Sequence, residues 1–179
     1  MLKQEKSLIV VIDVQGNLAK VVAESDQANL NVHRLVQGGL VLELPIFLTA
    51  QAPEKIGHTT PELRAFLPDH YEYPRTTFSI WRDEALRKAI AESDRNQVVL
   101  CGFESHICLY QTALEMMDAG FDVWIVADAV SSRSLYNKQT ALHELSQEGV
   151  HLTTVENALF AMLGDANHDQ FRTISKIVR

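Results

Sequence analysis

The residues best suited to chemistry lie in the segment VVLCGFESHICLY, residues 98–110, where a cysteine follows a buried strand. The apolar run 98–100 is typical of a strand buried on both faces, and 107–117 has a helical pattern, which places Cys108 near a helix N-terminus. Unpaired N–H groups and the helix dipole favour a thiolate there. Cys108 is therefore a candidate nucleophile; the alternative is a small buried hydrophobe, as free cysteines often are.

A carboxylate, Asp13, ends the apolar run LIVVID at residues 8–13. A cysteine nucleophile needs a group that takes its proton, and a pair of donors for the oxyanion that develops on the attacked carbonyl. Asp13 could accept the proton, and backbone N–H groups at the start of the Cys108 helix could hold the oxyanion. The alternative is that Asp13 only forms a turn, since Asp is common at such positions.

The other cysteine and the histidines predict no further chemistry. Cys101 falls within a strand pattern, and both cysteines are expected to be free thiols because the chain shows no secretion signal. No HxxH, HExxH or CxxC arrangement occurs, so we expect no metal. His106 is a poor base for Cys108, because neighbouring residues on a helix do not face each other, and is expected on the surface or in a pocket wall.

Length and composition predict one domain, residues 1–179, with a sizeable core. A net charge of −7 with basic residues scattered singly disfavours a nucleic-acid surface. The N-terminal apolar run is too short to span a membrane and lacks a small-residue cleavage site. We therefore expect a cytoplasmic protein whose partner is a small molecule or another subunit.

The elements that must position these residues alternate between strand and helix patterns, which predicts an α/β fold with a parallel sheet between two helical layers. A loop rich in turn residues is expected at 51–68. Strands are expected at 8–13, 45–50, 71–75, 97–102, 121–129 and 151–155, and helices at about 26–44, 83–92, 107–117, 135–148, 157–163 and from 168.

Ligands of open parallel sheets bind beyond the carboxyl ends of the strands, at the point where strand order reverses. Asp13 and Gln15 lie at the end of the first strand, Thr49 and Gln51 at the end of the second, Arg75 at the end of the third, and the segment 102–108 with Cys108 follows the fourth. If the fourth strand returns to lie beside the first, a carboxylate faces a thiol across the cleft.

Four segments together resemble a known family, the isochorismatase-like cysteine hydrolases, including the isochorismatase-domain-containing proteins. They are DVQ (13–15), RTTFSIW (75–81), CGFESHICLYQTALEMMDAGFDVWIVADAVSSRS (101–134) and GDANHDQF (164–171), so the resemblance covers nearly the whole chain. It implies a Rossmann-like, three-layer α/β/α sandwich whose six-stranded parallel sheet has the order 3-2-1-4-5-6. It also implies a homo-oligomer.

The resemblance further implies a catalytic triad of Cys, Asp and Lys. The nucleophile corresponds to Cys108 and the acid to Asp13, but the position of the lysine holds Arg75. Arginine stays protonated, so it can stabilise a thiolate or carboxylate by charge and cannot readily shuttle a proton. Proton transfer then falls on Asp13. A long side chain can cover much of the roughly 10 Å across two strands, and the alternative is an exposed loop arginine.

Two further features are implied at the site. A cis peptide between Phe103 and Glu104 would aim the N–H of Glu104, with that of Cys108, at the oxyanion. Metal-dependent nicotinamidases of this superfamily carry histidines where this chain has Gln15, which disfavours metal and nicotinamide alike. Aromatic rings can stack on a flat substrate or, alternatively, pack in the core. The expected pocket residues are Gln15, Thr49, Phe78, Trp81 and Phe103, whereas Asp128 and Ser131 are expected to form turns and caps.

The preferred function is a cofactor-free hydrolase of a small amide-type substrate. Cys108 attacks a carbonyl, an acyl-enzyme forms, Asp13 moves protons, and water releases the product. The main alternative is a binding or oligomeric scaffold protein, because Arg75 replaces the lysine. A nucleotide-binding domain is disfavoured because no GxGxxG follows the first strand. Isochorismate is disfavoured because vinyl-ether cleavage in that branch does not use this thiol.

Overall fold

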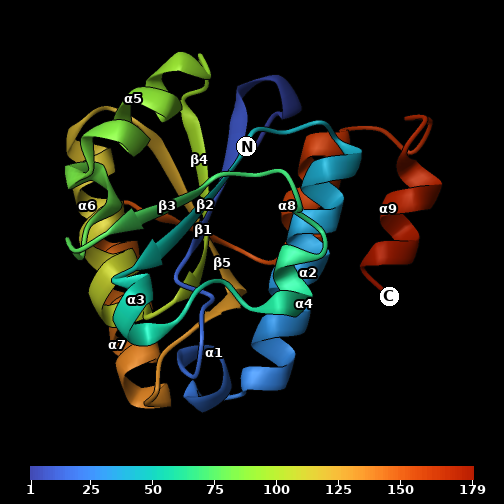
Figure 1. Cartoon of the computed structure of the whole chain (residues 1–179). Helices are drawn as coiled ribbons and strands as arrows, with labels where there is room; N and C mark the ends of the chain where they lie inside the picture. Colours follow the sequence, from blue (N-terminus) through green and yellow to red (C-terminus); the bar gives the residue numbers. More distant parts are fainter.

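A six-stranded sheet forms the centre of the computed structural model, which describes all 179 residues (Figure 1). All strand pairs are parallel, and the order is β3-β2-β1-β4-β5-β6. The predicted fold class and strand order are therefore confirmed, with the reversal of order between β1 and β4. The strands are β1 (Ser7–Ile12), β2 (Ile46–Gln51), β3 (Glu72–Arg75), β4 (Gln97–Phe103), β5 (Asp122–Ser131) and β6 (His151–Thr153).

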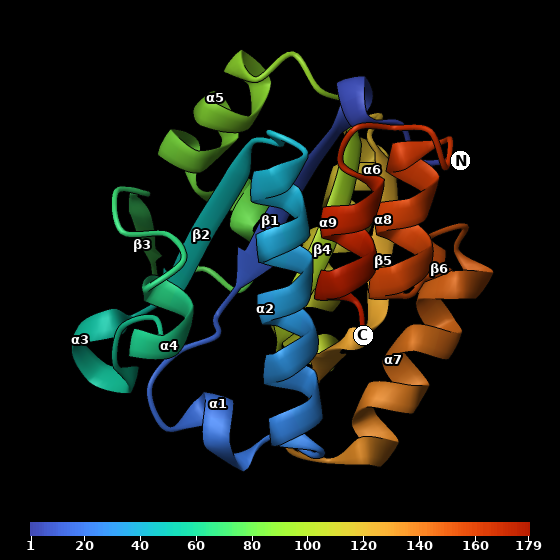
Figure 2. The same ribbon diagram turned by 90° about the vertical axis from the view of Figure 1, so that its right-hand side faces the viewer.

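Helices cover both faces of the sheet. One face carries α1 (Leu18–Val21), α2 (Ser25–Val41), α4 (Pro61–Arg64), α8 (Val155–Leu163) and α9 (Phe171–Ile177). In the rotated view, α2, α8 and α9 lie side by side in front of the strands (Figure 2). The opposite face carries α5 (Glu84–Glu92), α6 (Tyr110–Asp118) and α7 (Leu135–Gln147). No helix is long and apolar enough to cross a membrane.

Side chains along the buried strands point alternately to the two faces of the sheet, so the hydrophobic core has two parts. Ile9 of β1 packs toward α2, whereas Leu8 packs toward α5 and α6. Cys101 belongs to the first of these cores and Cys108 to the second, and both are free. The sheet therefore separates the two thiols, as expected for cysteines that do not form a disulfide.

Several boundaries differ from the sequence expectation. The segment 51–68 contains two single-turn helices, α3 (Pro53–Ile56) and α4, each with proline at the first position, where a missing N–H has no cost. Helix α2 ends at Val41 instead of Leu44, and a residue with positive φ, Glu43, follows it. Short 3-10 turns occupy Gln4–Lys6 and Ile80–Arg82.

Helix caps agree in part with the expectation. Asp83 caps α5 by accepting a hydrogen bond from the Leu86 N–H at 2.9 Å. Ser134 stands at the N-cap position of α7, but its hydroxyl accepts no hydrogen bond from the helix. Asp128 and Ser131 serve the structure: Asp128 Oδ1 accepts from the first N–H of α8 at 3.0 Å, and Ser131 donates to the Ala23 carbonyl at 2.6 Å.

Candidate active site

The carboxyl ends of β1 and β3 bring a buried ion pair together. Asp13 directly follows β1 with a φ of 53°, a left-handed conformation that Asp tolerates better than most residues. Arg75, the last residue of β3, places its Nη2 at 2.6 Å from Asp13 Oδ2. The two side chains are only 2% and 1% exposed. The arginine therefore spans two strands and is not an exposed loop residue.

Further contacts orient this pair. Thr49 Oγ1 lies 3.4 Å from Asp13 Oδ1 and 3.3 Å from the Val11 carbonyl. Arg75 Nη1 donates to the carbonyl of Thr77. The positive charge of the guanidinium opposes the effect of burial, so Arg75 stabilises the ionised form of Asp13 and holds the carboxyl group at a fixed position. Thr49 supports the carboxylate.

Cys108 is held next to this pair by a π-helical turn, Ser105–Leu109, that precedes α6. The peptide between Phe103 and Glu104 is cis, as the resemblance implied. The hydroxyl of Thr112 donates to the Cys108 carbonyl at 2.6 Å and accepts from the Ile80 N–H at 3.1 Å. π-turns are frequent at functional sites, and this one fixes a thiol that is 5% exposed.

The resting state of Cys108 differs from the sequence expectation of a thiolate. Burial raises the pKa of the thiol to about 12, and the negative charge of Asp13 acts in the same direction. The positive charge of Arg75 opposes both effects without cancelling them. Proximity to the helix N-terminus is thus outweighed by desolvation, and the free protein holds a neutral thiol.

Asp13 has the electrostatic character of a proton acceptor. Burial raises its pKa, whereas the charge of Arg75 and hydrogen bonds from Cys108 and Thr49 lower it. The net direction is upward. A carboxyl group whose pKa moves up toward neutrality accepts a proton more readily in a transition state.

Gln15 does not present its side chain to a substrate. Its amide nitrogen donates to the carbonyls of Gln51 and Gly57 at 2.9 and 2.6 Å, and its oxygen accepts from the Gln51 N–H at 2.7 Å. Both amide protons are used by backbone carbonyls, and the residue is fully buried. Gln15 therefore fastens the α3 segment to the turn that carries Asp13, which corrects its expected role as a pocket residue.

Replacing Gln15 by Leu should loosen the α3 segment. Three hydrogen bonds worth about 1 kcal/mol each are lost, so amide exchange over residues 51–57 should accelerate by more than tenfold. Hydrogen–deuterium exchange with peptide resolution measures this. Gln27→Leu is the control, because Gln27 is an exposed residue of α2 that bonds only within its helix. Equal exchange over 51–57 in wild type and Gln15→Leu contradicts the prediction.

The three aromatic residues expected in the pocket occupy different environments. Phe103 is fully buried in the core on the α2 side, so its ring does not wall a site at Cys108. Trp81 packs edge to face against Phe121, with ring centres 5.1 Å apart, in the manner of a residue at the margin of the core. Phe78 is 49% exposed, so its ring is the most open of the three to a ligand.

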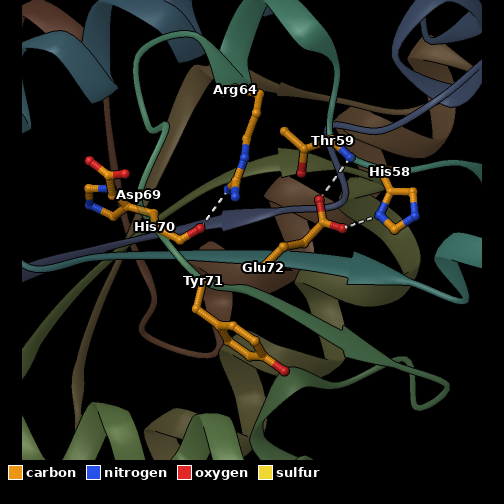
Figure 3. Close-up of a pocket in the computed structure, with 7 residues that line it drawn as sticks. All are labelled: His58, Thr59, Arg64, Asp69, His70, Tyr71 and Glu72. Atoms are coloured by element: carbon orange, nitrogen blue, oxygen red, sulfur yellow. Dashed lines mark hydrogen bonds and ion pairs between the residues drawn. The ribbon is translucent and has the colours of Figure 1, made fainter.

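A hollow of about 550 Å³ lies along the start of β3 (Figure 3). Its polar groups bond mainly to one another: Glu72 accepts from the Thr59 N–H at 2.9 Å and lies 2.6 Å from His58 Nδ1, and Arg64 donates to the His70 carbonyl at 2.6 Å. The hydrogen bond to Glu72 raises the pKa of His58. None of its lining residues belongs to the Asp13, Arg75 and Cys108 cluster.

Four residues that position the Cys108 turn were not predicted from the sequence. Thr112 was detectable as a threonine four residues after Cys108, the spacing at which its hydroxyl reaches the earlier carbonyl. The other three residues gave no local signal, because their partners lie on a different element of the chain. They are the side chain of Glu104 and the residues Ser132 and Arg133.

Comparison with known proteins agrees with this fold. The isochorismatase domain matches residues 7–157. Isochorismatase domain-containing protein 2 of Xenopus laevis is 36% identical over 99% of this chain and 85% of its own length. The secreted isochorismatase effector Isc1 of Phytophthora sojae is 33% identical over 97% and 84%.

Solved structures match over nearly the full chain. The MAR1 ribonuclease of Caenorhabditis elegans superposes with a TM-score of 0.93 at 28% identity, covering 99% of this chain and 91% of that one. The YcaC gene product of Escherichia coli, described as an octameric hydrolase of unknown specificity, gives 0.92 at 26% identity, covering 98% and 88%.

The sheet order and the cluster at its switch point define an isochorismatase-like α/β fold. The chain belongs to the isochorismatase family. Family membership supports a hydrolase.

Proposed function

We propose that this protein is a cofactor-free cysteine hydrolase that cleaves the C–N bond of a small amide-type substrate through an acyl-enzyme. The observation that carries the proposal is the buried Asp13–Arg75 pair beside the Cys108 thiol, at the reversal of strand order. Ligands of this fold class bind at that reversal. The three side chains supply a nucleophile, a proton acceptor and a fixed positive charge.

In the proposed first half-reaction, Cys108 Sγ attacks the substrate carbonyl carbon as its proton passes to Asp13. Coupling the two events avoids a free thiolate, which a pKa of about 12 disfavours. The oxyanion accepts hydrogen bonds from the N–H groups of Glu104 and Cys108. When the intermediate collapses, the C–N bond breaks, the amine leaves with the proton from Asp13, and a thioester remains.

In the second half-reaction, Asp13 accepts a proton from water as the water attacks the thioester. Collapse releases the carboxylic acid and returns the proton to Cys108. Arg75 stays protonated throughout and keeps Asp13 in place, so the single proton carrier is the carboxylate.

The less favoured alternative is a binding or oligomeric scaffold protein without hydrolase activity. A buried ion pair is costly to desolvate and contributes little net stability, so a protein selected only for binding gains little from retaining one. Here the pair is nearly fully buried, and it adjoins the thiol.

We further propose that the chain self-associates, because the E. coli relative is described as octameric. Light scattering coupled to gel filtration gives the number of subunits. A location in the cytoplasm stays a prediction from the sequence.

The nucleophile is tested with p-nitrophenyl acetate, a reactive acyl donor. Wild-type protein should release p-nitrophenolate in a burst and carry one acetyl group on the Cys108 peptide. Cys108→Ala should lower the burst rate by roughly a thousandfold or more. Any hydrolysis of small amides or ureides found by screening should be lost in the same variant.

The matched control is Cys101→Ala, because Cys101 is a fully buried free thiol on the other side of the sheet. It should keep the burst. Acetylation that persists in Cys108→Ala, or that maps to another residue, would overturn the proposal.

A further inference from the structure

Glu104, whose backbone N–H is assigned to the proposed oxyanion site, carries a buried charged side chain. The carboxylate is only 6% exposed and belongs to the residue whose N–H is proposed to hold the oxyanion. A buried carboxylate is tolerated only where it is paired. Its negative charge belongs to the same residue whose N–H would face the second negative charge, that of the oxyanion.

One residue, Arg133, supplies both hydrogen-bond donors to one oxygen of this carboxylate. Glu104 Oε1 accepts from Arg133 Nε at 2.7 Å and from the Arg133 backbone N–H at 3.1 Å. Arg133 follows β5, whose last residue, Ser131, pairs with Phe103 at the end of β4. Its side chain is 64% exposed and reaches inward from the surface.

Ser105 adds two hydrogen bonds between the turn before Cys108 and the end of β5. The Ser105 N–H donates to Ser132 Oγ at 3.1 Å, and Ser105 Oγ donates to the Ser131 carbonyl at 3.0 Å. His106 adds to it, with Nδ1 at 3.0 Å from Ser132 Oγ and Nε2 at 3.4 Å from Glu104 Oε2. The turn before Cys108 is thus fastened to the loop after β5 on the side away from the Asp13–Arg75 pair.

We propose that Arg133 is a positioning residue of the hydrolase, which neutralises the Glu104 carboxylate and so permits an oxyanion to form at the Glu104 N–H. The inference rests on the proposed function. Without the guanidinium, an uncompensated carboxylate would repel the oxyanion through a poorly screened interior. Arg133 therefore acts on the transition state through Glu104 and does not touch the substrate.

Two electrophiles that react with the same sulfur distinguish this effect on the oxyanion from a general disorder of the turn. Acylation by p-nitrophenyl acetate forms an oxyanion on the carbonyl before p-nitrophenolate leaves. Alkylation by iodoacetamide displaces iodide at a saturated carbon and forms no oxyanion. The measured quantity is the ratio of the acylation to the alkylation rate constant at Cys108, with each adduct located by peptide mass spectrometry.

Arg133→Ala should lower this ratio by about tenfold or more, the scale expected when one oxyanion interaction is impaired. The double variant Glu104→Gln with Arg133→Ala should recover most of the ratio, because the amide retains an acceptor and carries no charge. Arg133→Lys should keep the ratio close to wild type. An unchanged ratio in Arg133→Ala, or no recovery in the double variant, overturns the inference.

Arg82→Ala is the matched control and should keep the wild-type ratio. Arg82 is 63% exposed and donates from Nε to Glu115 at 2.7 Å, the same distance as in the Arg133 pair. Cys108→Ala distinguishes a failure of the proposed function from a failure of the proposed role of Arg133. If it keeps both reactions, the proposed function fails; if it loses both while Arg133→Ala keeps the ratio, only the role of Arg133 fails.

Discussion

Asp13→Asn is expected to change two reactions of the same thiol in opposite directions. Alkylation of Cys108 by iodoacetamide at pH 8 should become several-fold to tenfold faster than in wild type. Hydrolysis of the acetyl-enzyme formed with p-nitrophenyl acetate should become about a hundredfold to ten-thousandfold slower, the range attributed to general-base catalysis.

The physical reason is that the carboxylate has two effects on the sulfur. Its negative charge raises the pKa of Cys108, so its removal favours the thiolate and leaves Arg75 free to pair with it. Deacylation needs a group that accepts a proton from water, and an amide cannot do so. Asn is the suitable replacement because it also tolerates the left-handed backbone of residue 13.

The pH dependence supplies a second check. With a thiol pKa of about 12, the wild-type alkylation rate should rise about tenfold per pH unit from pH 7 to 10, because the thiolate fraction does. In Asp13→Asn the alkylation rate should level off at a lower pH than in wild type, because removing the negative charge lowers the pKa of Cys108. Unaltered deacylation would contradict the role of Asp13 as proton acceptor, and slower alkylation would contradict the effect of its charge on the pKa of Cys108.

Arg75→Met is expected to lower the free energy of unfolding by about 3–5 kcal/mol at neutral pH, because it leaves Asp13 buried without its partner. Adding Asp13→Asn should restore a large part of the loss, since no charge then remains unpaired. Arg75→Lys should stay close to wild type in stability, because it retains the positive charge.

The stability difference between wild type and Arg75→Met should shrink at low pH. Without the guanidinium, the pKa of folded Asp13 rises further above its unfolded value, so the folded state binds the proton more tightly. Stability of the variant then falls as pH rises above about 4, the ordinary Asp value. Urea unfolding at pH 5 and pH 7.5 measures the difference. A difference that is equal at both, or larger at pH 5, contradicts this account.

The fold and the reacting groups could be predicted from the sequence because their signals are local. The central strands β1 and β4 are largely apolar runs, and the reactive residues that come after them in the chain, Asp13 and Cys108, mark the edge where ligands bind. Arg75 was also recognisable, since it begins the segment RTTFSIW.

What could not be predicted depends on groups distant in the chain. The role of Gln15 depends on its hydrogen bond to the Gly57 carbonyl, and the role of Glu104 depends on its ion pair with Arg133. The protonation of Cys108 depends on how completely the folded chain removes it from water, a quantity that overrides the effect of the helix end. Prolines at the starts of α3 and α4 did signal helices, but single turns have too little periodicity to be recognised.

The position of the two cysteines on opposite faces of the sheet governs how the protein would withstand peroxide. The buried, protonated Cys108 reacts slowly with oxidants, because the thiolate is the reactive form. Once oxidised to a sulfenic acid, it has no resolving cysteine, since the side chain of Cys101, a residue of β4, packs on the opposite face of the sheet. Recovery then requires a thiol from outside the chain, and prolonged exposure converts the nucleophile irreversibly to higher oxidation states.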